Sequence, residues 1–160
     1  MLTIAGIQLA CGVDREENFA KALDFARIAV ERGARIVCFA ECFAWPWFPR
    51  KSVEANRTLA EPASGPMLRS LQLFAEQRDV VVLAPIFEAG YDAAHYNSTV
   101  VIDAGGPILG HGCLLRDHGV AREAPGNLSL DVCVRRLVGL RHRGRRAVQG
   151  MISVGPERTR

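Results

Sequence analysis

Apolar and polar residues along the first 112 positions fall into blocks that each have the length of one strand or helix. Leu2–Leu9 and Arg35–Ala40 are short apolar runs of the kind found in buried strands. Between these runs, apolar side chains recur at helical spacing at Phe19, Leu23, Ala26 and Val30. The order strand, helix, strand predicts a βαβ unit with parallel strands and a right-handed crossover.

The ends of this helix carry residues that commonly cap helices. Asp14 is a predicted N-cap, and Glu17 three positions later completes the pattern of a capping box. Gly33 follows the last apolar position of the helix, where a glycine often ends the helix in a left-handed conformation. We therefore expect the helix to lie between Asp14 and Gly33.

A second group of elements follows a long connection, Glu41–Pro62, which is rich in aromatic residues and proline. Loops of this length in compact domains are uncommon and are often functional. Ser64, Gly65 and Pro66 predict a helix start, with Leu68, Leu71 and Ala75 on its buried face. The remaining apolar blocks predict a third strand, then a fourth that Gly105-Gly106 turns into a hairpin: Val80–Phe87, Asn97–Asp103 and Pro107–Gly112.

The regular pattern stops after residue 112. Residues 1–112 carry 10 basic and 13 acidic side chains, whereas residues 113–160 carry 10 arginines, no lysine and four acidic side chains. Leu128–Val138 fits neither the strand nor the helix period, Arg135–Arg146 is dense in arginine, and we expect no secure element after Leu140. The sequence thus divides into a regular domain (1–112) and an atypical, basic, Arg-rich C-terminal tail (113–160), for which we expect poor order.

Composition narrows the class of protein. No apolar run is long enough for a membrane helix, and Met1–Gln8 lacks the basic start of a secretory signal. The five cysteines are odd in number and form no CxxC pair, which argues against a disulfide framework and a zinc site. We therefore expect a cytoplasmic protein with reduced thiols, without a membrane partner, and with loop or surface histidines at His95, His111, His118 and His142.

Glu41 is the position where the pattern points to chemistry. It directly follows the strand Arg35–Ala40, and ligands of open α/β sheets bind beyond the carboxyl ends of the strands. Aromatic neighbours would partly desolvate this carboxylate and raise its basicity, as a general base requires. An N-cap or a surface salt bridge explains a glutamate at this position equally well, so the position alone leaves both readings open.

The order of motifs resembles the N-terminal part of the nitrilase superfamily of carbon–nitrogen hydrolases. The matching pieces run in the same order over about 110 residues, and the finer resemblance is to N-carbamoyl amidohydrolases of the N-carbamoylputrescine and β-ureidopropionate types. These pieces are Ile7–Ala10, Glu31–Ala34, Ile36–Phe43, Leu59–Pro62 with Gly65-Pro66, Val80–Glu88, Tyr96–Asp103 and Ile108–Gly110. Ala40 and Cys42 depart from the family, which usually has Pro-Glu-Leu-Phe or Gln-Glu-Ala-Trp here.

The resemblance implies an α/β fold, the four-layered αββα sandwich, of which this chain holds an incomplete part. It also implies cleavage of non-peptide C–N bonds in N-carbamoyl amines or linear amides by a Glu–Lys–Cys acyl-enzyme mechanism, without a metal or other cofactor. In this chain Glu41 carries over as the base, and Trp47 and Phe48 are candidates for the substrate pocket. Apolar faces left open by an incomplete sandwich would favour association, so we expect a homo-oligomer if the chain folds.

The lysine and the cysteine of that mechanism do not carry over directly. The family's lysine lies in a Gly-Lys-Tyr-Arg-Lys-like stretch after the hairpin, but here Gly110 is followed by His111–His118, and no lysine occurs after Lys51. Arg116 could supply charge, but as a planar fork rather than a compact donor. Cys133 is the candidate nucleophile because it follows the strand-like Leu130–Val132, although Val134-Arg135-Arg136 replaces the family's aromatic–acidic pair.

Three further hypotheses concern the origin of the tail and the function of the chain. An out-of-frame C-terminus would explain the sudden loss of motifs, and translating the coding DNA from codon 111 in the other two frames tests this. A catalytically inactive scaffold or binding protein is the alternative to a hydrolase. Nucleic-acid binding through Arg135–Arg146 ranks last, because no aromatic residue beyond Tyr96 offers a stacking platform, so we expect no nucleic-acid partner.

Overall fold

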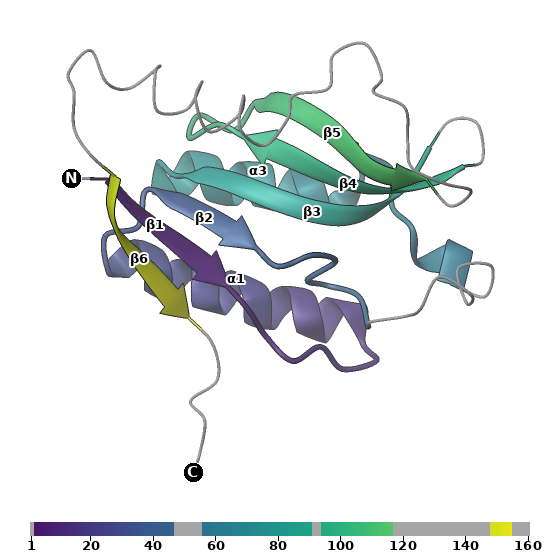
Figure 1. The fold of residues 1–160 in the computed structure, drawn as a ribbon, viewed down its shortest axis with the longest axis horizontal. Coiled ribbons are helices and arrows are strands. Elements are labelled where there is room, and N and C mark those ends of the chain that lie inside the picture. The colour runs from purple at the N-terminus through teal and green to yellow at the C-terminus, as the bar shows by residue number, and fades with distance from the viewer. Residues whose placement is uncertain (1, 47–55, 91–93, 117–147, 155–160) are drawn as a thin grey trace.

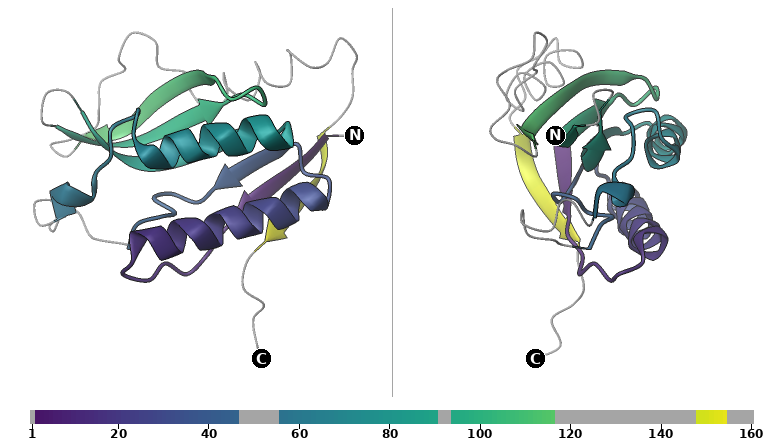
Figure 2. Two further views of the ribbon diagram at one scale, coloured as in Figure 1. Left: turned by 180° about the vertical axis from the view of Figure 1, so that it is seen from behind. Right: turned by 90° about the vertical axis from the view of Figure 1, so that its right-hand side faces the viewer.

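A single mixed sheet with two helices on one of its faces makes up the fold (Figures 1 and 2). The computed structural model describes residues 2–46, 56–90, 94–116 and 148–154. The strand order in the sheet is β5-β4-β3-β2-β1-β6. The elements are β1 (Leu2–Ile7), α1 (Arg15–Glu31), β2 (Ile36–Phe39), the 3₁₀ helix η2 (Arg57–Leu59), α3 (Pro66–Arg78), β3 (Val81–Ala89), β4 (His95–Ile102), β5 (Ile108–Arg116) and β6 (Val148–Val154).

The predicted βαβ unit is confirmed in its elements and in the parallel pairing of its strands. β1 and β2 pair parallel, with Ile4 opposite Ile36, and α1 connects them. The Asp14 carboxylate accepts a hydrogen bond from the Glu17 amide at 2.9 Å, so Asp14 is the N-cap. The capping box is not closed from the other side, because the Glu17 carboxylate pairs with Lys21 at 2.8 Å. Gly33, with φ +91°, ends the helix as expected.

The second group of elements also follows the sequence pattern. β3 pairs parallel with β2, and the hairpin strands β4 and β5 continue the sheet in antiparallel pairing. α3 begins after Gly65 and buries Leu68, Leu71 and Ala75, the three positions predicted for its inner face. β5 runs past Gly112 to Arg116, so the hairpin is longer than the predicted Pro107–Gly112.

The expectation of no element after Leu140 is wrong. β6 pairs parallel with β1, with Ile7 opposite Val154, and it lies at the edge of the sheet (Figure 1). Its apolar run is short, and the hydrogen bonds that make it a strand come from β1, which is distant in sequence. The ambiguous segment Leu128–Val138 and Cys133 lie outside the described residues. Among the helices that the structure describes, none is long and apolar enough to cross a membrane.

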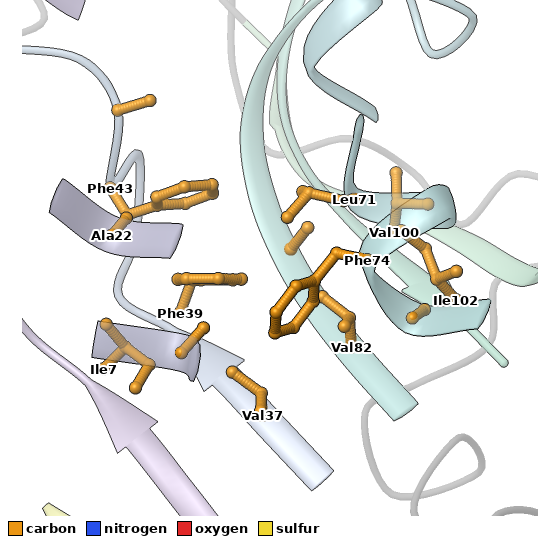
Figure 3. Close-up of a cluster of buried hydrophobic side chains, with 14 of the residues drawn as sticks. Ile7, Ala22, Val37, Phe39, Phe43, Leu71, Phe74, Val82, Val100 and Ile102 are labelled. Carbon is orange, nitrogen blue, oxygen red and sulfur yellow. The ribbon is translucent and has the colours of Figure 1, made fainter. Parts of the chain in front are cut away.

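The core lies between the sheet and its two helices. β1, β2, β3 and β4 contribute Ile7, Val37, Val82 and Val100, and α3 contributes Leu71 and Phe74 (Figure 3). A smaller apolar cluster occupies the opposite face of the sheet, formed by Ile36, Val81, Leu83, Val101 and Ala104. The described residues therefore provide one sheet and one helical layer of the expected αββα sandwich, and both faces of this sheet are apolar.

The burial pattern of α3 generates a stability prediction. Leu71 is fully buried, whereas Leu73 on the same helix is 56% exposed. Truncating Leu71 to Ala removes core contacts and leaves a cavity, so we expect Leu71→Ala to lower the free energy of unfolding by about 2–5 kcal/mol. Leu73→Ala is the matched control and should change it by less than about 0.5 kcal/mol. Urea denaturation followed by circular dichroism measures both, and equal losses would contradict the assignment of the buried face.

Candidate active site

Glu41 stands at the carboxyl end of β2, where the sequence placed it. The Ala40 amide still donates to the carbonyl of Ile7 at 3.0 Å, which extends the parallel pairing by one residue. Glu41 follows and is exposed, and Cys42 then adopts a left-handed conformation with φ +48°. The chain therefore turns sharply at the edge of the sheet and presents the glutamate there.

Aromatic residues anchor the chain just after this turn. Phe43 and Trp45 are each only 1% exposed, and the Phe43 ring stacks on Phe39 with centroids 4.3 Å apart. The Trp45 indole Nε1 donates to the carbonyl of Leu59 at 2.6 Å, which ties the two ends of the long connection together. The proposed pocket residues Trp47 and Phe48 lie outside the described residues.

Glu41 is not desolvated in the way that the sequence predicted. The carboxylate is exposed, because the aromatic side chains that follow it, Phe43 and Trp45, belong to the core. Among the described residues its hydrogen-bond partner is Asn97 on β4, whose Nδ2 donates to Oε1. An ionised carboxylate only accepts hydrogen bonds, so the amide nitrogen must be the atom that faces it.

A second carboxylate, Glu88, is buried at the end of β3 and has partners on both neighbouring strands. It is 7% exposed. Ser98 on β4 donates its hydroxyl to Oε2, and the His111 Nε2 on β5 lies 2.7 Å from the same oxygen. The hydrogen bond to Glu88 raises the pKa of His111, and this exceeds the opposing effect of burial. His111 was expected in a loop or on the surface. Its side chain is exposed, as a surface position requires, but it lies on strand β5 rather than in a loop and pairs with a buried carboxylate.

A third carboxylate, Glu61, connects the starts of both helices. Its Oε1 accepts the amide of Met67 in the first turn of α3 at 2.8 Å. Its Oε2 lies 3.2 Å from Nη1 of Arg15, the first residue of α1, as an ion pair without a well-directed hydrogen bond. Gly65 leaves the space for this side chain, since a Cβ there would lie 2.1 Å from Oε1 of Glu61. Glu61 is thus a helix-capping residue for α3.

The three cysteines whose side chains the structure describes are not activated. Burial raises the pKa of Cys38 to about 11, and burial, with the charge of Glu41 adding to it, raises that of Cys42 to about 12. The pKa of Cys11 is also raised by burial, and its thiol donates to the carbonyl of Phe43 at 3.1 Å. Because the thiolate is the nucleophile, none of these thiols is suited to attack a substrate at neutral pH.

Sequence reasoning found Glu41 but neither its partner Asn97 nor the group that the buried Glu88 forms with Ser98 and His111. Glu88 ends one apolar run, and Asn97-Ser98 begins another. Polar residues inside buried strands need hydrogen-bond partners, so these positions could have been recognised as parts of a buried polar group. Among the described residues, no group of three or more His, Cys, Asp or Glu side chains is placed to hold a metal ion. What the geometry offers is an exposed, oriented carboxylate that can accept a proton from a bound molecule.

Comparison with known proteins gives a consistent result. A family model described as carbon-nitrogen hydrolase matches residues 3–118. N-carbamoylputrescine amidase of Solanum lycopersicum is 35% identical over 111 residues, which are 69% of this chain and 37% of that protein. Citrullinase of Francisella tularensis is 30% identical over 110 residues, 68% of this chain and 38% of the relative. The chain thus spans less than two fifths of the length of these relatives.

Solved structures agree on the fold. Nit3 of Saccharomyces cerevisiae, a member of the nitrilase superfamily, superposes with a TM-score of 0.60 at 19% identity, covering 76% of this chain and 47% of Nit3. A carbon-nitrogen hydrolase from Helicobacter pylori gives a TM-score of 0.53 at 18% identity, covering 69% of this chain and 39% of that one. The sheet with its two helices therefore matches part of the nitrilase fold.

The His111–Glu88 pair predicts a pH-dependent contribution to stability. Because the pKa of His111 is raised in the folded state, the pair stabilises the fold fully below the unfolded pKa of about 6.5. That contribution is lost as the pH rises through the folded pKa. We expect His111→Gln to destabilise the protein more at pH 5.5 than at pH 8.5, by less than about 1 kcal/mol because the ring is 41% exposed.

Urea denaturation at the two pH values measures this difference. In a Glu88→Gln background the His111 substitution should lose its pH dependence, because the carboxylate that raises the pKa is gone. A pH dependence that persists without Glu88 would assign the effect to another group.

The close approach of Gly65 and Glu61 predicts a second stability effect. Gly65→Ala forces the Glu61 side chain away from the Met67 amide, so we expect a loss of about 1–3 kcal/mol in the free energy of unfolding. Gly12→Ala is the control, because the nearest atom to its Cβ would be Asn18 Oδ1 at 3.8 Å. Similar losses for the two variants in chemical denaturation would show that Glu61 does not need the space at Gly65.

Proposed function

The chain belongs to the carbon–nitrogen hydrolase family, and from this we propose that it hydrolyses non-peptide C–N bonds with Glu41 as the general base. The observation that carries the proposal is the place of Glu41, exposed at the carboxyl end of a parallel strand and held by Asn97. Ligands of open α/β sheets bind at this edge, so a substrate would meet the carboxylate there.

The relatives favour a class of substrate. The curated proteins most similar in sequence include N-carbamoylputrescine amidases and a citrullinase. N-carbamoylputrescine and citrulline both carry a urea-type group, in which a carbonyl carbon is bonded to two nitrogens. We therefore propose an N-carbamoyl amine or a linear amide as the substrate of this chain.

The proposed reaction passes through an acyl-enzyme. Glu41 accepts the proton of a cysteine thiol, and the thiolate sulfur attacks the carbonyl carbon. The C–N bond then breaks as protonated Glu41 returns this proton to the leaving amine, which leaves a thioester-type intermediate. Glu41 next removes a proton from water, the hydroxide attacks the thioester, and the acid product is released with the thiol restored.

The nucleophile that we propose is Cys133. Its support is the strand-like segment that precedes it in the sequence, together with the raised pKa of Cys11, Cys38 and Cys42, which makes these three poor nucleophiles. The oxyanion would require a donor such as a lysine ammonium. Lys21 does not serve, because it lies on α1 and pairs with Glu17.

A catalytically inactive scaffold is the second candidate function. It is favoured by the absence of any lysine after Lys51 in the sequence and by the unactivated state of the three described thiols. In that case the sheet and its two helices would be kept for binding a partner, and Glu41 would have no chemical role.

A trapping experiment separates the two functions. The full chain is incubated with N-carbamoylputrescine, citrulline and a linear amide, and intact-mass and peptide mass spectrometry follow acyl adducts while ammonia release is measured. We expect an adduct on Cys133 and a loss of turnover of about 10²–10⁴-fold in Glu41→Gln. Glu76→Gln, the same change on the exposed surface of α3, is the matched control and should leave turnover unchanged.

Two results would reject the hydrolase. The absence of both adduct and turnover in the folded wild-type chain would favour the scaffold. Turnover that is the same in Glu41→Gln and Glu76→Gln would remove the role of Glu41. An adduct on a cysteine other than Cys133 would keep the reaction class and replace the nucleophile.

A further inference from the structure

Asn97 and Ser98 are adjacent on β4 and bind two different carboxylates. The Asn97 side chain donates to Glu41, and the Ser98 hydroxyl donates to Glu88. Because successive side chains of a strand point to opposite faces of the sheet, the two contacts lie on opposite faces. Ser98 and its partner His111 share the face of Val100, which packs in the core under the helices. Asn97 therefore reaches Glu41 from the side of β4 opposite to the one that Ser98 and His111 share.

The backbone of Asn97 is fixed from both sides. It pairs with Phe87 on β3 and with Leu115 on β5. On β5 the register shifts between the partners of Asn97 and Ser98, which are Leu115 and Cys113, so Leu114 is an extra residue there. Such a bulge increases the local twist and redirects the strand, and bulges are common beside active sites. The continuation of β5 beyond Gly112 thus contributes to where Asn97 sits.

From this geometry we infer that Asn97 is a positioning residue for the base, holding Oε1 of Glu41 so that Oε2 faces the proton to be transferred. An exposed glutamate has three rotatable side-chain torsions, and a single hydrogen bond from a strand restricts all of them. The donor is a neutral amide, so it orients the carboxylate without placing a compensating positive charge beside it. The inference rests on the proposed function only in taking Glu41 as the base.

Nuclear magnetic resonance of the full chain tests the contact without requiring turnover. The side-chain amide signals of Asn97 are followed while the pH is lowered until Glu41 is protonated. We expect one Asn97 amide proton to shift upfield, because a carboxylic acid is a weaker acceptor than a carboxylate, and this shift to vanish in Glu41→Gln. Asn97 amide chemical shifts that stay constant while Glu41 is protonated would overturn the inference.

The chain contains a matched internal control. The Asn18 side chain donates to two backbone carbonyls, those of Gly12 at 3.0 Å and Ala44 at 3.3 Å. Backbone carbonyls do not titrate, so the Asn18 amide signals should stay constant over the same pH range. Equal shifts at Asn18 and Asn97 would indicate a global change and count against the specific contact.

The positioning role is tested on Glu41 itself. The coupling constants of the methylene protons in the Glu41 side chain report its rotamers. We expect values typical of a single rotamer in the wild type and values averaged over several rotamers in Asn97→Ala. Asn97→Asp is the second variant, because it keeps the shape of the side chain but replaces the amide donor by a negative charge that repels Glu41. The Glu41 coupling constants should be averaged in this variant as well. A Glu41 side chain that remains in one conformer in a folded variant would show that Asn97 does not position it.

Activity measurements separate this inference from the proposed function. If the wild type turns over, Asn97→Ala should lower kcat by about 10-fold with little change in KM, since orientation rather than binding is lost. An inactive wild type with an ordered Glu41 would overturn the hydrolase and leave the positioning role of Asn97 standing. An active chain whose Glu41 already averages between conformers would overturn the role of Asn97 and leave the hydrolase.

Discussion

The structure depends on the burial of β2 between two parallel neighbours. This strand has only four residues, Ile36–Phe39, and it pairs with β1 on one side and β3 on the other. Val37 and Phe39 face the helices, and Ile36 belongs to the apolar cluster of the opposite face. A strand that is buried on both faces cannot slip in register without exposing these side chains. Its last residue therefore fixes where the chain leaves the sheet, and with it the position of Glu41.

Three glutamates gather near this end of the sheet, and their surroundings give them different roles. Glu61 is buried and bound to a helix amide and an arginine, and Glu88 is buried and bound to a serine and a histidine. Burying a carboxylate is costly unless it is paired and hydrogen-bonded, so these partners are needed for the fold. Glu41 alone is exposed, with one neutral partner among the described residues. The same sheet thus carries two buried carboxylates that stabilise the fold and one exposed carboxylate, that of Glu41.

The sequence could predict what depends on local pattern. The apolar runs, the helical spacing, the cap at Asp14 and the glycine turn at Gly33 are each set by neighbouring residues, and the structure confirms them. The contacts it could not predict join distant positions. Glu41 and Asn97 are 56 residues apart, and the pairing of His111 with Glu88 requires the exact stagger of three strands. Nothing local marks β6 either, because its strand character depends on β1 as a partner.

The size of each catalytic effect decides what this chain needs in order to be an enzyme. A positioned general base alone contributes about 10²–10⁴-fold, whereas enzymes typically accelerate their reactions by at least about 10⁶-fold. An oxyanion donor adds about 10²–10³-fold, and covalent attack requires a thiolate, which the described thiols do not provide because their pKa values are raised. If Glu41 is the base that we propose, held by Asn97, the three described thiols still do not supply the nucleophile, and a working hydrolase would have to draw it from another cysteine of the chain.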